Sequence, residues 1–221
     1  MNIKVIITGV TGMVGEGVLL ECLSRPEVES IFVIGRKPSG IKHEKVKEIV
    51  HDDFFDYSSI KGQLAGYNAC FFCLGITSVG VKEDQFTHIT YDLTMAFAKT
   101  LVEINPDMTF NYVTGYGTDS SEKGRVMWAR VKGKTENDLL KLPFKQAYMF
   151  RPGYMQPVKG AKNVHTYYKV MGFMYPALRA LFPKFVTTMA ELGQAMINSV
   201  LRGYDKPVLE CKDIVKLAKN Q

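Results

Sequence analysis

The stretch Ile3-Lys-Val-Ile-Ile-Thr-Gly-Val-Thr-Gly-Met-Val-Gly15 decides the fold. Its apolar run breaks into three glycines at three-residue spacing, which predicts a strand, a tight turn and the start of a helix. Gly9 permits the sharp turn, Gly12 lets the backbone approach a phosphate, and Gly15 lets the helix pack closely on the strand. Free N–H groups and the helix dipole supply positive potential there. The stretch therefore predicts a pyrophosphate site in a Rossmann fold.

Length and composition indicate one globular domain. The chain has 221 residues, of which 46% are hydrophobic, enough for one substantial core. Four scattered cysteines make no disulfide framework, which favours a reducing compartment. Met1 leads directly into the first strand, so no signal peptide is expected, and Val170 to Phe182 is too short and too interrupted to cross a bilayer. A cytoplasmic protein with no transmembrane segment is expected.

Charge and potential metal ligands narrow the function classes. The net charge is +6, but Lys and Arg are spread along the chain, so no nucleic-acid partner is expected. Cys70 and Cys73 have CxxC spacing, yet they lie in a strand pattern with no second pair or histidine nearby. The four histidines, His43, His51, His88 and His165, form no ligand cluster. No metal site is expected.

The first 150 residues alternate β-branched runs with amphipathic segments, which is typical of a doubly wound parallel sheet with helices on both faces. Strands are expected at Ile31 to Ile34, Val46 to His51, Ala69 to Leu74, Thr109 to Thr114 and Ala147 to Phe150, in addition to the first one. Helices are expected at Met13 to Leu23, Tyr57 to Leu64, Asp84 to Glu103 and Val126 to Leu140.

The alternation fades from Arg151 onward. The expected elements there are an apolar helical stretch from Tyr167 to Phe182, a helix from Thr188 to Leu201, a short strand from Pro207 to Leu209 and a basic tail. We expect residues 1–221 to form a single Rossmann domain, with 151–221 contributing a small helical cap on the substrate side. The apolar stretch fits core, a homodimer interface, or a protein or membrane-surface contact.

The end of the second strand predicts the cofactor. NAD sites usually place an acid there for the ribose 2′-hydroxyl, whereas NADP needs a cation for the 2′-phosphate. This chain has Arg36 and Lys37 and no acid, which favours NADP(H) over an ordinary basic loop. Asp53, after the third strand, is expected either to bond the adenine amino group or to cap a turn.

The region after the fifth strand bears on catalysis. A reductase needs an acid near the carbonyl oxygen, and a Tyr-x-x-x-Lys pair supplies one because residues i and i+4 share a helix face. This chain has Trp128-Ala-Arg-Val-Lys132 instead. The helix, the spacing and the lysine are present, but an indole N–H does not exchange its proton at useful pH.

Six motifs in the right order, over about two-thirds of the chain, resemble one family. They are Thr8 to Gly15, Val33-Ile-Gly-Arg36, Phe72-Cys-Leu-Gly75, Phe110 to Gly115, Arg130-Val-Lys-Gly133 with Glu136, and Phe150-Arg-Pro-Gly153. The chain resembles an atypical short-chain dehydrogenase/reductase and is most similar to the Tat-interacting-protein oxidoreductases. The resemblance implies NADP(H) in the glycine turn, Lys132 on the nicotinamide ribose, and Arg151-Pro152-Gly153 leading into the cap.

Two departures from the family pattern leave the activity open. Trp128 stands at the catalytic tyrosine, and Thr114-Gly115 stands where the family carries a serine. Thr114 could provide a hydroxyl, with Thr118 or Ser120 as substitutes, and Tyr116 could be a relocated acid or a packing residue. One hypothesis is a reductase of a small carbonyl substrate; the alternative is a catalytically silent NADP(H)-binding regulator or sensor.

The expected site residues follow from these patterns. The candidates for catalysis are Lys132, Thr114 and Tyr116. The candidates for cofactor binding are Gly9, Thr11, Gly12, Met13, Val14, Gly15, Arg36, Lys37, Asp53, Leu74, Gly75, Lys132, Arg151 and Pro152.

Overall fold

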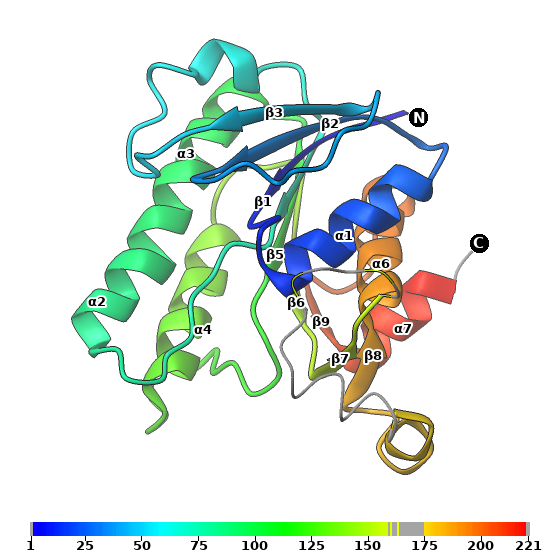
Figure 1. Cartoon of the computed structure of the whole chain (residues 1–221). Coiled ribbons are helices and arrows are strands. Elements are labelled where there is room, and N and C mark those ends of the chain that lie inside the picture. Colours follow the sequence, from blue (N-terminus) through cyan, green and yellow to red (C-terminus); the bar gives the residue numbers. More distant parts are fainter. Residues whose placement is uncertain (1, 159, 161–162, 164–174, 220–221) are drawn as a thin grey trace.

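The computed structural model describes residues 2–158, 160, 163 and 175–219, and its centre is a seven-stranded parallel sheet (Figure 1). The strand order is β3-β2-β1-β4-β5-β6-β9. The strands are β1 (Ile3–Thr8), β2 (Val28–Gly35), β3 (Val46–Val50), β4 (Ala69–Phe72), β5 (Thr109–Val113), β6 (Gln146–Arg151) and β9 (Val208–Glu210). The order reverses between β1 and β4, which is the switch point where doubly wound folds bind ligands.

Helices cover both faces of the sheet (Figure 1). One layer contains α1 (Met13–Ser24), α6 (Met189–Arg202) and α7 (Cys211–Lys219), and the other contains α2 (Glu83–Thr87), α3 (Leu93–Ile104) and α4 (Met127–Leu139). Two buried clusters lie under these layers, and Phe71 and Phe72 of β4 point into one each. The prediction of a doubly wound parallel sheet is therefore confirmed.

Two predicted helices differ in detail. Of Tyr57 to Leu64, only Lys61–Leu64 forms a 3-10 turn. The Asp56 carboxylate accepts a hydrogen bond from the Ser58 N–H at 2.8 Å, and such Asx turns compete with helix formation. The helix predicted for Asp84 to Glu103 is present as one run over 83–104, but it contains a π-helical turn at His88–Asp92.

Much of the C-terminal part completes the domain. Helix α6 packs on α1 so closely that a Cβ on Gly193 would lie 2.7 Å from the Glu21 Cβ. The short strand predicted near Pro207 is β9, at the edge of the sheet, and the predicted basic tail is the amphipathic helix α7. Its buried Ile214, Leu217 and Ala218 face the core while its lysines face outward. The sequence therefore indicated the basic character of this segment but not its helix.

A second, two-stranded sheet was not predicted. It pairs β7 (Tyr154–Gln156) with β8 (Val186–Thr188) in parallel, next to the end of β6. The predicted apolar helical stretch of Tyr167 to Phe182 is described only in part: residues 175–181 are helical, and 167–174 lie outside the described residues. No helix within the described ranges is both long and apolar enough to span a membrane.

Candidate functional site

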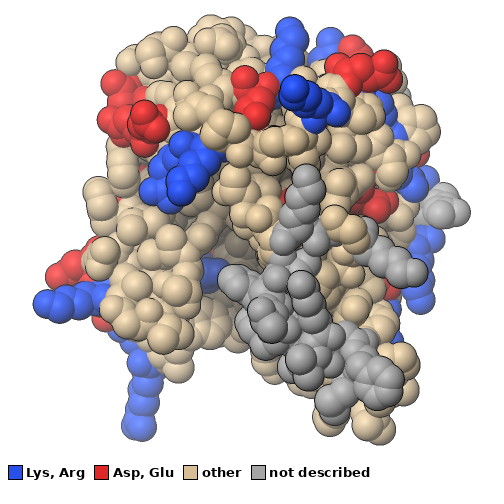
Figure 2. Space-filling model, viewed as in Figure 1, with Lys and Arg blue, Asp and Glu red and all other residues tan. Residues whose placement is uncertain are grey.

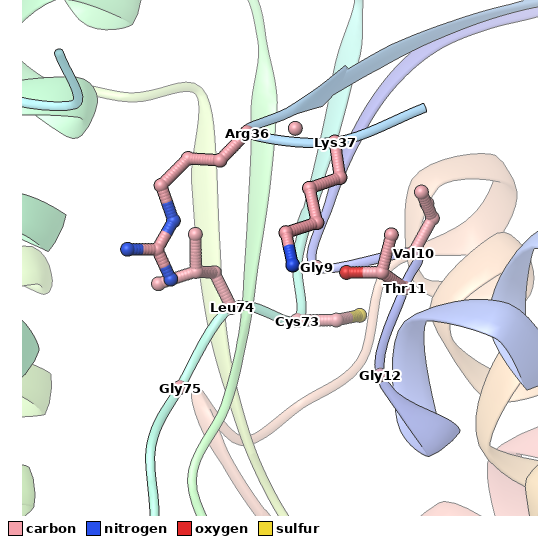
Figure 3. Close-up of a pocket in the computed structure, with 10 residues that line it drawn as sticks. Gly9, Val10, Thr11, Gly12, Arg36, Lys37, Cys73, Leu74 and Gly75 are labelled. Carbon is pink, nitrogen blue, oxygen red and sulfur yellow. The ribbon is translucent and has the colours of Figure 1, made fainter. Parts of the chain in front are cut away.

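Three clefts lie side by side along the carboxyl edge of the sheet and share Leu74 and Gly75. The glycine cleft, of about 520 Å³, is lined by Gly9, Val10, Thr11, Gly12, Gly35, Arg36, Lys37, Cys73, Leu74 and Gly75 (Figure 3). The Asp53 cleft, of about 480 Å³, is lined by Arg36, Asp52, Asp53, Phe54, Phe55, Leu74, Gly75, Ile76, Ile89 and Leu93. The third, the Trp128 cleft, continues from Gly12 in the other direction. Together they form one trough across the switch point of the sheet.

The glycine turn is as tight as its sequence predicted. Gly9 has a φ of +73°, and a Cβ there would lie 2.6 Å from the Cys73 carbonyl. A Cβ on Gly15 would lie 2.2 Å from the Gly9 oxygen, so α1 approaches β1 only because this residue lacks a side chain. Gly12 is the N-cap of α1 and makes no side-chain cap hydrogen bond. The first N–H groups of α1 therefore meet the trough at a helix N-terminus, where anions are stabilised.

Two cations flank the glycine turn. Figure 3 shows the side chains of Arg36 and Lys37 extending from the end of β2 toward Leu74 and the turn. Arg36 lines both the glycine cleft and the Asp53 cleft, and both cations are exposed. In the Asp53 cleft, a carboxylate oxygen of Asp53 accepts a hydrogen bond from the Phe55 N–H at 2.8 Å. Asp53 therefore caps a turn and lines the cleft at the same time.

The Trp128 cleft, of about 560 Å³, brings together the residues expected to take part in catalysis. It lies between the start of α1, the ends of β4, β5 and β6, and the first turns of α4. It is lined by Gly12, Met13, Val14, Cys73, Leu74, Gly75, Ile76, Val113, Thr114, Gly115, Tyr116, Trp128, Lys132, Pro152, Gly153 and Met155. Trp128 and Lys132 lie one turn apart on α4 and both line the cleft.

Lys132 is held at the end of β5. Its ammonium donates a hydrogen bond to the Thr114 carbonyl oxygen at 2.8 Å. Burial lowers the pKa of Lys132 to about 8, with the nearby Glu136 carboxylate opposing that shift. An ammonium has three donors, so two remain after the bond to Thr114. This lysine can therefore present an acidic proton to the Trp128 cleft near neutral pH.

A buried ion pair lies behind Lys132. The Glu136 carboxylate, fully buried on α4, accepts hydrogen bonds from the Arg151 guanidinium, including one from the Nε–H that is shared between both carboxylate oxygens at 3.1 Å. The same carboxylate accepts a bond of 2.5 Å from the Thr114 hydroxyl. The guanidinium also donates to the Ser120 hydroxyl at 2.5 Å. The pair thus joins α4 to the ends of β5 and β6. Burial alone would lower the pKa of Arg151, but the hydrogen bonds and charges of Glu136 and Glu210 outweigh it and raise that pKa.

Several expected site residues have different surroundings from those predicted. Arg151 lines none of the three clefts, because its side chain is turned inward to Glu136, whereas its neighbour Pro152 does line one. The Thr114 hydroxyl is likewise committed to Glu136. Of its proposed substitutes, Thr118 donates to the Gly115 carbonyl at 2.8 Å and Ser120 accepts from Arg151. Tyr116 lies at the rim of the Trp128 cleft, half-exposed, with its ring edge-to-face on Phe185.

Part of this lining was not predicted from the sequence. Ile76, Val113 and Met155 line the Trp128 cleft, and Cys73 lines it together with the glycine cleft. Ile76 directly follows the predicted Gly75, and Val113 directly precedes Thr114, so their positions at strand ends could have indicated them. Met155 follows a turn whose course no pattern predicted. In the described part of the chain, no group of three His, Cys, Asp or Glu side chains is placed to hold a metal ion.

The turn, the uncapped helix start and the switch-point trough have the form of a dinucleotide site of the Rossmann type. Fold comparisons agree. The Helicobacter pylori ADP-L-glycero-D-manno-heptose-6-epimerase matches with a TM-score of 0.67 at 13% identity, over all of this chain and 81% of that one. Bordetella bronchiseptica WbmG, in complex with NAD and UDP, matches with a TM-score of 0.66 at 12% identity, over 99% and 77%. At such identities these likenesses establish the fold alone.

Sequence comparisons point to one group of relatives. Rat protein HTATIP2 is 26% identical over 156 residues, which are 70% of this chain and 63% of that protein. Protein fmp52-1 of Aspergillus terreus is 24% identical over 98% of this chain and 99% of its own length. The first curated relatives are covered over slightly less than two-thirds of their length. No family model matches the chain. The predicted resemblance to the atypical short-chain dehydrogenases/reductases is confirmed by these relatives and by the fold.

The relatives contradict one expectation. Several FMP52 proteins, including those of Scheffersomyces stipitis and Debaryomyces hansenii, are named mitochondrial. The expected cytoplasmic location was therefore wrong. That expectation depended on the start of the sequence and on its few cysteines, and neither feature separates one reducing compartment from another.

Proposed function

We propose that this chain binds NADP(H) along the trough and reduces a small carbonyl compound in the Trp128 cleft. The overlap of the three clefts carries the proposal, because neighbouring clefts share lining residues on the way from Asp53 past the glycine turn to Lys132. A dinucleotide is long enough to need all three. In this arrangement the start of α1 holds the pyrophosphate, Arg36 and Lys37 hold the 2′-phosphate, and Asp53 bonds the adenine. Leu74, Gly75 and Pro152 enclose the nicotinamide half.

Lys132 is the proton donor in this proposal. When bound, NADPH would supply the hydride chemistry for the carbonyl carbon. Lys132 orients the carbonyl oxygen with a free N–H, gives it a proton and regains one from water, so the product is an alcohol. The hydroxyl of Thr114 faces Glu136 and takes no part in the reaction. Thr114 contributes only its backbone carbonyl, which holds Lys132 in place. Tyr116 acts as a wall of the cleft rather than as an acid. The chain acts as a single domain in which β7, β8 and Phe185 close the substrate side.

One observation favours a second candidate function. Trp128 fills the position of the usual acid, and a protein with no efficient proton donor would hold NADP(H) without turning it over. Such a chain would be a sensor of cofactor occupancy. A homodimer remains a prediction from the sequence.

The preference between NADPH and NADH tests the cofactor assignment. NADPH is expected to bind about tenfold more tightly than NADH, since charge-assisted hydrogen bonds to a phosphate contribute a few kcal/mol at most at an exposed site. Arg36→Ala should remove most of that preference, as measured by calorimetric titration with both cofactors. Arg125→Ala is the matched control, because Arg125 is exposed and lines none of the three clefts. Equal affinities of the wild-type protein would exclude the 2′-phosphate assignment.

The pH dependence of turnover tests the proton donor. Reduction of a generic aldehyde is expected to fall as the pH rises through about 8, because the ammonium of Lys132 loses its proton there. Steady-state rates between pH 6 and about 10 would record this fall, since that range covers the acid and base forms of the lysine.

The reduction rate of the variant Trp128→Tyr, compared with that of the wild type, tests the effect of the missing tyrosine. A phenol one turn from Lys132 restores the usual acid, so the rate is expected to rise about 100-fold, within the range typical of general acid catalysis. Trp128→Phe is the matched control and should leave the rate near that of the wild type. If the wild-type enzyme is fast and Trp128→Tyr does not change its rate, the absence of a tyrosine at position 128 does not limit proton donation. Turnover in Trp128→Tyr alone would favour the sensor.

A further inference from the structure

Most of the side chains that line the Trp128 cleft are apolar. Its side chains include those of Met13, Val14, Ile76, Val113, Trp128 and Met155, which come from five separate segments. In Figure 2 the hollow near the centre of the face is bordered mainly by residues that are neither acidic nor basic. Apolar walls with few polar groups select ligands by shape and by desolvation.

Charge is scarce around this cleft. Lys132 is the one charged side chain that lines it within the described residues, and its ammonium is anchored to the Thr114 carbonyl. The neighbouring cations of α4 are engaged outside the cleft: Arg130 with Glu83 at 2.8 Å and Lys134 with Asp138 at 2.9 Å. A carboxylate or phosphate placed away from the reacting carbonyl would therefore lose water without gaining a partner, which is costly.

The rim adds an aromatic edge. The rings of Tyr116 and Phe185 meet edge-to-face with centroids 4.8 Å apart, and 52% of Tyr116 and 39% of Phe185 remain exposed. Phe185 is held in position because its backbone oxygen accepts a hydrogen bond from the Tyr154 N–H at 2.9 Å. Two adjacent exposed rings at the mouth of an apolar cleft can pack against an aromatic or branched aliphatic group.

We propose that the Trp128 cleft takes an uncharged aldehyde or ketone with an aromatic or branched aliphatic body, and that it rejects anionic carbonyl compounds. This inference rests on the proposed function, since it assigns the substrate class of the same site. The contrast with the matched folds is informative. The epimerase from H. pylori carries a sugar nucleotide in its name and WbmG was solved with UDP. A nucleotide diphosphate needs cations that the described lining of this cleft does not offer.

The chain contains its own reporter for the test. Trp128 is the single tryptophan and it lines the cleft, so changes in its emission report on occupants of this cleft. The probes are 4-methylbenzaldehyde and 4-formylbenzoate, which have similar shapes and differ in charge. We expect the neutral aldehyde to bind at least about tenfold more tightly, because the carboxylate would be buried without a partner. Equal binding, tighter binding of the anion, or no saturable binding of the neutral aldehyde would overturn the proposal.

A charge introduced at the rim should change this selectivity. Phe185→Lys is expected to lower the preference for the neutral probe by about tenfold, because the ammonium pairs with the carboxylate and the aromatic edge is lost. Val50→Lys is the matched control: Val50 is a similarly exposed apolar residue on β3, lines none of the three clefts, and should leave the preference unchanged. An unchanged preference in Phe185→Lys would show that the rim does not contact the probes.

The titrations are run with and without NADP⁺. This oxidised cofactor has no hydride to donate, so the aldehyde probes are not reduced during the measurement. This design separates the two proposals. Failure of NADP⁺ to bind would contradict the proposed function, while the comparison of the two probes in the absence of cofactor would still decide the substrate class. Binding of NADP⁺ with no preference for the neutral probe would overturn only the substrate class.

Discussion

Arg151→Met is expected to lower the free energy of unfolding by about 3–5 kcal/mol, because it leaves a buried carboxylate without its partner. Glu136 is fully buried, and Arg151 supplies most of its hydrogen bonds. The remaining bond, from the Thr114 hydroxyl, cannot balance the charge. Urea denaturation at pH 7.5 measures the loss.

Two controls isolate the buried charge. The double variant Arg151→Met with Glu136→Leu should recover much of the stability, because apolar side chains can replace a buried ion pair at little net cost. Arg130→Met removes a pair with Glu83 that is partly exposed, so it should cost less than about 1 kcal/mol. If Arg151→Met costs no more than Arg130→Met, the Glu136 pair does not stabilise the ends of β5 and β6.

The ion pair also explains why sequence reasoning assigned Arg151 differently. The motif Phe150-Arg-Pro-Gly153 resembles a cofactor-binding segment, and Pro152 and Gly153 do line the Trp128 cleft. A motif gives the order of residues but not the side to which each side chain turns. Glu136 lies fifteen residues earlier on α4, and only the packing of α4 against β5 and β6 brings its carboxylate to Arg151.

The main sheet could be predicted because its signals are local. Apolar runs marked β1, β2, β4 and β5, and the glycine spacing marked the start of α1. The misses depend on tertiary contacts or on very short elements. Strands β7 and β8 have three residues each and are separated by a long segment, so no periodicity could indicate their pairing. Helix α7 has nine residues, and its lysines obscured an apolar face that becomes evident only against α6.

The trough could be predicted in outline for the same reason. The glycine turn and Arg36 follow directly from the ends of β1 and β2, where doubly wound folds place ligands. The sequence indicated Lys132, Thr114 and Tyr116 as catalytic candidates and left the identity of the proton donor open. The Thr114 hydroxyl faces Glu136, a contact over 22 residues that no local pattern encodes. That contact is the structural basis for the choice of Lys132 in the proposed reduction.

Gly12→Asp is expected to weaken NADPH binding by at least about 100-fold while leaving the fold intact. Gly12 is the N-cap of α1 with extended backbone, a position at which aspartate is among the best residues. Its carboxylate would bond the N–H groups that the pyrophosphate needs and would repel the phosphates. A Cβ there lies 3.3 Å from the Gly9 oxygen, which requires a small adjustment of the turn. Stability should change by less than about 1 kcal/mol.

Titrating the protein with NADPH while recording Trp128 emission tests whether the trough is an NADP(H) site that ends at Trp128. Reduced nicotinamide absorbs where tryptophan emits, so a cofactor in this trough should quench Trp128 saturably and emit in return. We expect saturable quenching in the wild type and its loss in Gly12→Asp. Gly62→Asp is the control and should retain the quenching, because it adds the same charge at a site with open space around it. No saturable quenching in the wild type, or equal quenching in Gly12→Asp, would contradict the assignment of the trough as an NADP(H) site.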